Sequence, residues 1–136
     1  MEKLNVLDFI EVTGVFERKI NLALNYAGLR LPHFKALNYL EMKGKITVSD
    51  LSKALTVTRA TTSVLVNQLI KAGALESIDN SSDKRSYYLR LTSLGLQRLN
   101  VARQEVALVE EKITSKLPQE LVKTLNHVSI LVKEEL

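Results

Sequence analysis

The sequence predicts a mainly α-helical fold with one small β-hairpin. Over most of the chain, apolar residues recur every three or four positions, which is the spacing of one face of a helix. Residues 87–91 differ, because their side chains alternate with the period of a strand and follow the turn-rich segment 79–85. With 136 residues, 46% of them hydrophobic, the chain is long enough for one domain, residues 1–136, with its own core.

Composition excludes several classes of protein. A charged fraction of 25% and the lack of a long apolar run argue against disorder and against a membrane span. The chain has no cysteine, which excludes disulfides, thiolate metal sites and thiol redox sensing. No secretory signal pattern follows Met1, so we expect a cytoplasmic protein.

The positive charge is concentrated in the middle of the chain. The net charge is +4, and residues 1–31 and 96–136 each contain as many basic as acidic side chains. The whole excess lies in residues 32–95, which carry nine basic and five acidic side chains. A local basic excess favours a polyanionic partner, although an excess of this size is also ordinary on soluble proteins.

Long helices are expected at both ends of the chain. The first spans Leu4 to Ala27 and ends at Gly28, and its apolar residues cover more than one face. Near the other end, Thr92 begins a long helix, and Pro118 forces a restart that gives a final helix. These helices carry more apolar surface than the middle of the chain can cover, so we expect a homodimer.

Three short helices are expected between them. Pro32 fits the first turn of a helix that ends near Gly44, and the segment 47–50, Thr-Val-Ser-Asp, matches the capping pattern of a second. Thr58 caps the third, which ends at Gly73. Only three residues separate the last two helices, which is the spacing of a helix-turn-helix.

The hairpin completes the predicted fold class. Leu75, Leu89 and Leu91 are expected to lie over the short helices, while Lys84 and Arg85 stay at the free tip. The prediction is therefore a winged helix: a helix-turn-helix with a two-to-three-stranded β-wing, flanked by long N- and C-terminal dimerisation helices. Residues 32–95 form its DNA-binding core, and residues 1–31 and 96–136 form the helical dimerisation region.

The helix that Thr58 caps is predicted to present a polar face to DNA. A rotation of 100° per residue turns Thr62, Leu65 and Val66 inward. The predicted DNA contacts are the cap and the outward positions: Thr58, Arg59, Ala60, Thr61, Ser63, Val64, Asn67 and Gln68. Amides pair with adenine and an apolar side chain meets a thymine methyl, so this set favours A·T-rich sites. The alternative is a solvated face with Val64 packed on a neighbouring loop.

The wing tip supplies a second set of predicted DNA contacts, Asp83, Lys84 and Arg85. The carboxylate of Asp83 is expected to orient the guanidinium of Arg85, which a narrow A·T minor groove attracts. The alternative is a tip that is merely solvated.

The sequence resembles the MarR family of bacterial transcriptional regulators. The resemblance lies in segments 51–55 (Leu-Ser-Lys-Ala-Leu), 57–61 (Val-Thr-Arg-Ala-Thr), 69–76 (Leu-Ile-Lys-Ala-Gly-Ala-Leu-Glu), 83–85 (Asp-Lys-Arg) and 91–95 (Leu-Thr-Ser-Leu-Gly). It implies a repressor that binds a palindromic operator as a homodimer and is released by a small aromatic ligand. Two positions depart from the family pattern: Val64 stands where a basic residue is expected, and Ser77 where Arg is common.

The expected ligand site follows mainly from this resemblance. A small aromatic effector would bind in a cleft between the dimerisation helices and the winged domain, near Phe16, Tyr26, Arg30 and His33.

No catalytic or metal constellation is recognisable. His33 and His127 lie far apart, no glycine-rich phosphate loop is present, and no acidic or histidine cluster has ligand spacing. We therefore expect no enzyme, no cofactor and no metal. The competing hypothesis is a winged-helix module that docks on a protein instead of DNA, which would need neither Arg85 nor the central basic excess.

Overall fold

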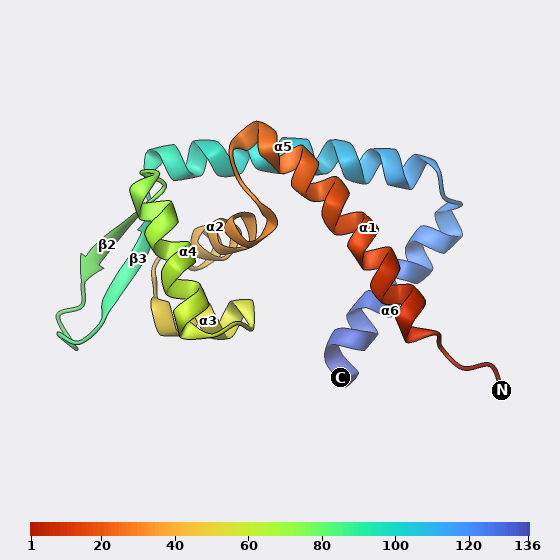
Figure 1. The fold of residues 1–136 in the computed structure, drawn as a ribbon, viewed down its shortest axis with the longest axis horizontal. Helices are drawn as coiled ribbons and strands as arrows, with labels where there is room; N and C mark the ends of the chain where they lie inside the picture. Colours follow the sequence, from red (N-terminus) through yellow and green to blue (C-terminus); the bar gives the residue numbers. More distant parts are fainter.

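The computed structural model describes residues 1–136 and has the predicted mainly helical architecture with a three-stranded antiparallel sheet (Figure 1). Its elements in chain order are α1 (Val6–Leu24), η1 (Asn25–Ala27), α2 (Leu31–Lys43), β1 (Ile46–Thr47), α3 (Val48–Leu55), α4 (Arg59–Lys71), β2 (Leu75–Asp79), β3 (Tyr87–Leu91), α5 (Ser93–Ser115) and α6 (Gln119–Glu135).

Three helices begin at the hydroxyl residues that the sequence indicates. The side-chain oxygen of Thr47 accepts from the backbone N–H of Asp50 at 3.1 Å, and Thr58 accepts from Thr61 at 3.1 Å. Thr92 caps α5 in the same way, accepting from Gly95 at 3.0 Å. Each cap satisfies a backbone donor that has no partner within its helix, which fixes where the helix starts.

The first helix differs in detail from the prediction. It begins at Val6, not at Leu4, because the side chain of Asn5 caps it. Its predicted last turn, Asn25–Ala27, is a 3₁₀ turn that ends at Gly28 with φ of 70°. A residue without a Cβ is favoured in this left-handed conformation, so the chain turns there toward α2.

The sheet has the strand order β1-β3-β2. Leu75 pairs with Leu91 across the hairpin, and Ile46 pairs with Leu89 on the other side of β3. The predicted wing allowed for a third strand, but the sequence did not locate β1, since two residues are too short to show an alternating pattern. Its pairing with β3 ties the start of α3 to the wing.

A shared core joins the short helices, the sheet and the first part of α5. The large side chains that are fully buried come from six elements: Leu24, Leu37, Leu40, Leu51, Val66, Leu89 and Leu99. Because α5 packs against α1, α2 and β3, it connects the winged part of the chain to the terminal helices (Figure 1).

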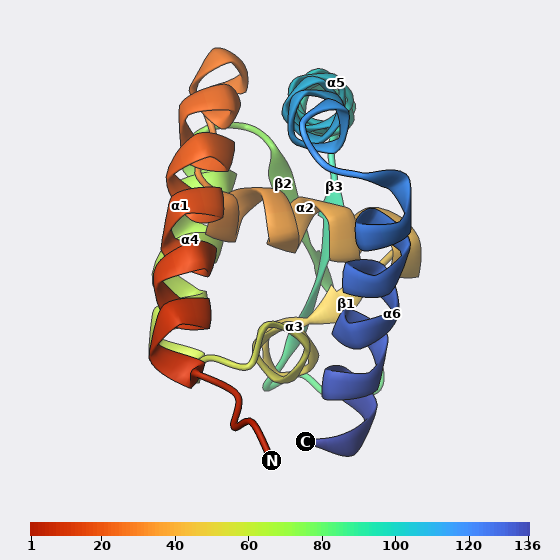
Figure 2. The same cartoon turned by 90° about the vertical axis from the view of Figure 1, so that its right-hand side faces the viewer.

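The terminal helices leave large apolar side chains exposed. Helix α6 has no buried residue, and α1 buries only Ala23 and Leu24. In Figure 2, α1 and α6 lie on opposite sides of the molecule, and both extend downward from the level of α5. The exposed apolar residues of α1 and α6 include Leu7, Phe9, Ile10, Leu121, Leu125, Val128, Leu131 and Val132. No helix of the chain combines the length and the apolar character needed to cross a bilayer.

Candidate nucleic-acid interface

Helix α4 has the buried and exposed faces that its sequence predicts. Its buried residues are Thr62, Leu65, Val66 and Leu69. The hydroxyl of Thr62 donates to the carbonyl of Thr58 at 3.0 Å, so its polar group is satisfied inside the domain. All eight predicted DNA contacts of this segment are exposed, including Thr61, Ser63 and Asn67. The structure therefore leaves this face of α4 free for a ligand.

Val64 is the exposed apolar side chain on this face, with 58% of its surface accessible. No neighbouring loop buries this side chain. An exposed valine between hydrogen-bonding neighbours has the chemistry to contact a thymine methyl.

The turn between α3 and α4 holds the two helices close together. Thr56 adopts a left-handed conformation with φ of 59°, and its N–H donates to the carbonyl of Lys53. The N–H of Val57 donates to the carbonyl of Ser52, which closes the end of α3. This arrangement lets the chain reverse within three residues, as a helix-turn-helix requires.

The wing tip is organised by its own side chains. Asn80 is buried, and its amide donates to the hydroxyl of Ser86 at 3.0 Å. The carboxylate of Asp83 accepts from the backbone N–H of Arg85 at 3.0 Å and from Arg85 Nε at 3.3 Å. The Arg85 side chain is nevertheless 92% exposed. Asp83 thus orients the guanidinium while leaving it open to solvent.

The wing and helix α4, the candidate recognition helix, share one edge of the molecule. Figure 1 shows α3, the N-terminal end of α4 and the wing tip along the lower side of the left-hand half. Arg59, Lys84 and Arg85 on these elements are exposed. A polar helix face flanked by free cations has the composition of a surface that contacts phosphates and base edges.

Of the four predicted ligand residues, His33 lines a cavity beside α4, whose lining does not include Phe16, Tyr26 or Arg30. Phe16 is 41% exposed on α1, and Tyr26 is 80% exposed in η1. His33 lines a cavity of about 280 Å³. The other residues that line this cavity are Gly28, Leu29, Gln68, Leu69, Ala72 and Arg98, so it lies between the start of α2, α4 and α5. No pattern in the sequence pointed to Arg98, since it lies 65 residues from His33.

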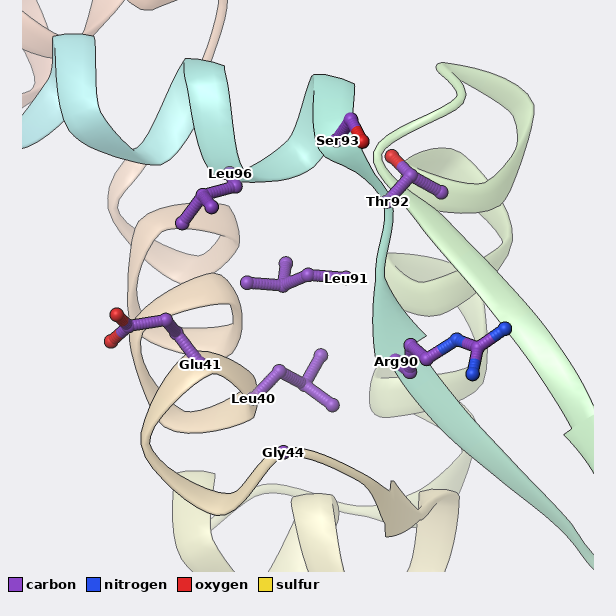
Figure 3. Close-up of a pocket in the computed structure, with 8 residues that line it drawn as sticks. All are labelled: Leu40, Glu41, Gly44, Arg90, Leu91, Thr92, Ser93 and Leu96. Atoms are coloured by element: carbon purple, nitrogen blue, oxygen red, sulfur yellow. The ribbon is translucent and has the colours of Figure 1, made fainter.

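A second cavity, of about 380 Å³, is lined by none of the predicted DNA-binding or ligand-binding residues (Figure 3). Leu40, Leu91 and Leu96 converge in it, while Glu41 and Arg90 point to opposite sides. Arg90 is engaged by Glu76 at 2.6 Å and Glu41 by Arg103 at 2.9 Å. The two charged residues that line this cavity are therefore already paired. The chain also has no group of three His, Cys, Asp or Glu side chains placed to hold a metal ion.

The fold, with this exposed polar and basic edge, is that of a winged helix-turn-helix protein. A sequence model described as the MarR family matches residues 27–86, which include the helix-turn-helix and most of the wing. This match covers less than half of the chain, and together with the structural likenesses below it makes the chain similar to the MarR family of transcription regulators. Members of this family are regulators and not enzymes. No curated protein sequence matches the chain significantly.

Solved structures share the fold over nearly the whole chain. The apo form of wild-type MarR from E. coli is 24% identical, with a TM-score of 0.82 over 97% of this chain and 98% of that one. A mutant MarR from E. coli complexed with operator DNA is 25% identical, with a TM-score of 0.83 over 91% and 89%. NadR in complex with 4-hydroxyphenylacetate is 20% identical, with a TM-score of 0.74 over 97% and 93%.

Proposed function

We propose that the chain is a repressor that binds a palindromic operator as a homodimer in the cytoplasm. The observation that carries this proposal is the exposed guanidinium of Arg85, which Asp83 orients on the same edge as the polar face of α4. A cation that is held in place but not neutralised by burial is suited to a groove of concentrated negative potential.

The recognition helix would lie in the major groove. Thr61, Ser63, Val64 and Asn67 are its exposed side chains with the chemistry to contact base edges or phosphates. Thr58, Arg59 and Ala60 lie at its N-terminal end, where backbone N–H groups and a small side chain allow close approach to a phosphate. Lys84 on the wing would contact a phosphate beside the minor groove that receives Arg85.

We assign dimerisation to residues 1–31 and 96–136 and DNA binding to residues 32–95. The support is the exposed apolar surface of α1 and α6, which a second copy of the chain would cover. A two-fold protein matches an operator whose half-sites lie about one helical turn, roughly 10 bp, apart.

We also propose a small aromatic acid as the effector. The cavity beside His33 has a volume suited to a single-ring ligand, and Arg98 in its wall supplies a cation for a carboxylate. The structural relative NadR was crystallised with 4-hydroxyphenylacetate, which supports this ligand class. Because the cavity borders both α4 and α5, binding there would shift the recognition helix relative to the terminal helices.

The effector is tested by titrating 4-hydroxyphenylacetate and salicylate into the protein. We expect both to raise the melting temperature of the unmodified protein and to lower its affinity for the operator. Arg98→Ala should abolish both effects while it binds the operator normally in the absence of ligand. If neither acid changes melting temperature or DNA affinity, this effector class is wrong.

DNA binding is tested with Arg85→Ala, using the upstream region of the chain's own gene as the first operator candidate. We expect weaker binding to operator and to unrelated A·T-rich DNA alike. The salt dependence should become flatter by about 0.9 for each phosphate that the variant no longer neutralises. Asp83→Ala should give a milder reduction in affinity, because the guanidinium remains but is no longer oriented. Lys123→Ala, which removes one exposed charge from α6, is the control and should bind normally.

The alternative is a winged-helix module that docks on a protein. It predicts that Arg85→Ala leaves operator affinity and salt dependence unchanged. That result would remove the wing from the DNA interface and favour the docking function.

A further inference from the structure

A hydrogen bond joins the recognition helix to the start of α2. His33 Nε2 lies 2.9 Å from Oε1 of Gln68, 35 residues away in the sequence. The other side-chain hydrogen bonds of α4 are local, between Thr58 and Thr61 and between Thr62 and Thr58. The bond between His33 and Gln68 is therefore the one side-chain hydrogen bond that connects α4 to another helix.

The two bonds of the His33 ring require one tautomer. Its Nδ1 accepts from the backbone N–H of Arg30 at 3.3 Å, so the ring proton is on Nε2. The Nε2–H group then donates to Oε1 of Gln68, which fixes the orientation of the Gln68 amide. The His33 ring is thus held at both nitrogens, and the Gln68 amide is held at Oε1.

The same stretch of α2 is anchored to α1. The backbone N–H of Leu31 donates to Oδ1 of Asn21 at 2.8 Å, one residue from the Arg30 N–H that the His33 ring holds. A short run of hydrogen bonds thus passes from α1, through residues 30–33, to Gln68 on α4. These hydrogen bonds connect α4 to a terminal helix.

This geometry bears on how Gln68 contributes to DNA recognition. A glutamine reads adenine with both ends of its amide, accepting from N6 and donating to N7. In Gln68 one of the two lone pairs of Oε1 already accepts from His33, which turns the amide toward the start of α2.

We propose that His33 and Gln68 form a tether that positions the recognition helix, and that Gln68 does not read a base. The proposal rests on the proposed DNA-binding function and assigns His33 and Gln68 a role within it. Asn67, whose exposed side chain precedes Gln68, remains the amide that reads adenine. Loss of the tether lets α4 rotate or shift, which weakens every base contact without changing which bases are preferred.

The test uses the full-length protein, its operator and a panel of operators with single base-pair changes. His33→Leu and Gln68→Leu should each lower operator affinity about three- to tenfold, the usual effect of one missing hydrogen bond. Because both remove the same bond, the double variant should bind no more weakly than either single variant. The base preference across the panel should stay that of the unmodified protein, and non-specific binding should be unchanged.

Asn67→Ala is the matched control, since it removes an amide at the adjacent position of the same helix. It should relax the preference at one base pair of each half-site, which the tether variants should not do. If Gln68→Leu relaxes the preference at a base pair, Gln68 reads that base and the proposal is wrong. It is equally wrong if His33→Leu leaves operator affinity unchanged, or if the effects of the two substitutions add.

A second measurement, of the His33 tautomer, uses the unmodified protein without DNA and so does not depend on whether the leucine variants fold. In ¹⁵N spectra of the free unmodified protein, the His33 ring should show a protonated Nε2 and an unprotonated Nδ1. The opposite tautomer, or rapid exchange between the two, would overturn the tether. If this signature is present but no operator is bound, the DNA-binding proposal fails while the link between α2 and α4 stands. Where the leucine variants do not fold, His33→Asn and Gln68→Ala replace them.

Discussion

Thr56 adopts a backbone conformation that β-branched residues rarely take. Its φ of 59° makes it the one non-glycine residue of the chain with positive φ. In this region the Cβ approaches the following carbonyl, at a cost of roughly 1–2 kcal/mol. The conformation persists because two backbone hydrogen bonds, from Thr56 to Lys53 and from Val57 to Ser52, close the turn between α3 and α4. The tight reversal of the helix-turn-helix thus depends on a strained residue.

We therefore expect Thr56→Gly to stabilise the protein by about 0.5–1 kcal/mol, since relief of strain exceeds the added freedom of the unfolded chain. Chemical denaturation of the two proteins measures the difference. Thr114→Gly, the same exchange within α5, is the control and should lower stability by a similar amount. A destabilised Thr56→Gly would show that the Thr56 side chain stabilises the turn by contacts that outweigh its strain.

At the scale of the elements, the start of α5 packs directly on the backbone that enters β2. A Cβ built on Gly95 would lie 2.1 Å from the carbonyl oxygen of Ala74, far inside contact distance. The same junction is tied by Thr92, whose hydroxyl donates to the carbonyl of Gly73 while accepting from the N–H of Gly95. This contact sets how the wing lies against the long helix.

Gly95→Ala should therefore destabilise the protein by about 1–3 kcal/mol or more, because a backbone carbonyl cannot move aside as a side chain would. Gly14→Ala is a matched control within α1, where the new Cβ meets only the Arg18 side chain at 3.6 Å. This control should be neutral or should stabilise the helix by up to about 1 kcal/mol. Equal melting temperatures for Gly95→Ala and the unmodified protein would contradict the packing described for this junction.

Helices α2 and α5 are joined by a charged contact that depends on pH. Arg103 Nη2 donates to Glu41, and this hydrogen bond, followed by the charge of Arg103, lowers the pKa of Glu41 below its ordinary value of 4.5. A carboxyl whose pKa is lower in the folded than in the unfolded state stabilises the fold above the unfolded pKa. That contribution disappears as the pH falls below about 4.5 and through the folded pKa. The effect is small, because both side chains are well exposed.

Glu41→Gln should accordingly lower the melting temperature slightly at about pH 7, and the difference from the unmodified protein should shrink as the pH falls below 4.5. Thermal unfolding of both proteins between about pH 7 and about pH 3 measures this difference. Glu120→Gln, on the exposed surface of α6, is the control without such a partner. A constant difference across the pH range would show that the ion pair contributes nothing to acid stability.

Local signals in the sequence were sufficient for the helices and the hairpin but not for strand β1 or for the contacts between elements. Thr58 and Gly73 mark the ends of α4 because capping depends on residues within one turn. The pairing of β1 with β3 and the bond from His33 to Gln68 join segments far apart in sequence, and no periodicity reports such contacts. The ion pair of Asp83 with Arg85 was predictable because the two lie two residues apart.

At the scale of the whole molecule, α6 carries an exposed apolar stripe that a second surface would stabilise by burying it. Leu121, Leu125, Val128 and Val132 fall on one side of this helix, each between 41% and 45% exposed. Burying such side chains contributes about 1.5–3 kcal/mol each, so leaving the stripe in water has a substantial cost. The exposed apolar residues of α1 add a second unpaired surface on the same half of the molecule. A second copy of the chain would supply both complementary surfaces through one two-fold axis.

We expect the unmodified protein to be a dimer in light scattering at micromolar concentration and Leu125→Glu to shift it toward monomer, since a carboxylate in an apolar interface loses its hydration. Lys123→Glu changes charge on the opposite side of the same helix and should remain dimeric. Leu125→Glu should lower the affinity for the operator much more than the affinity for non-specific DNA. The reason is that only a dimer holds two recognition helices about one helical turn apart. A monomeric unmodified protein, or a Leu125→Glu variant that stays dimeric and binds operator normally, would place the interface elsewhere and remove the geometric basis for a palindromic operator.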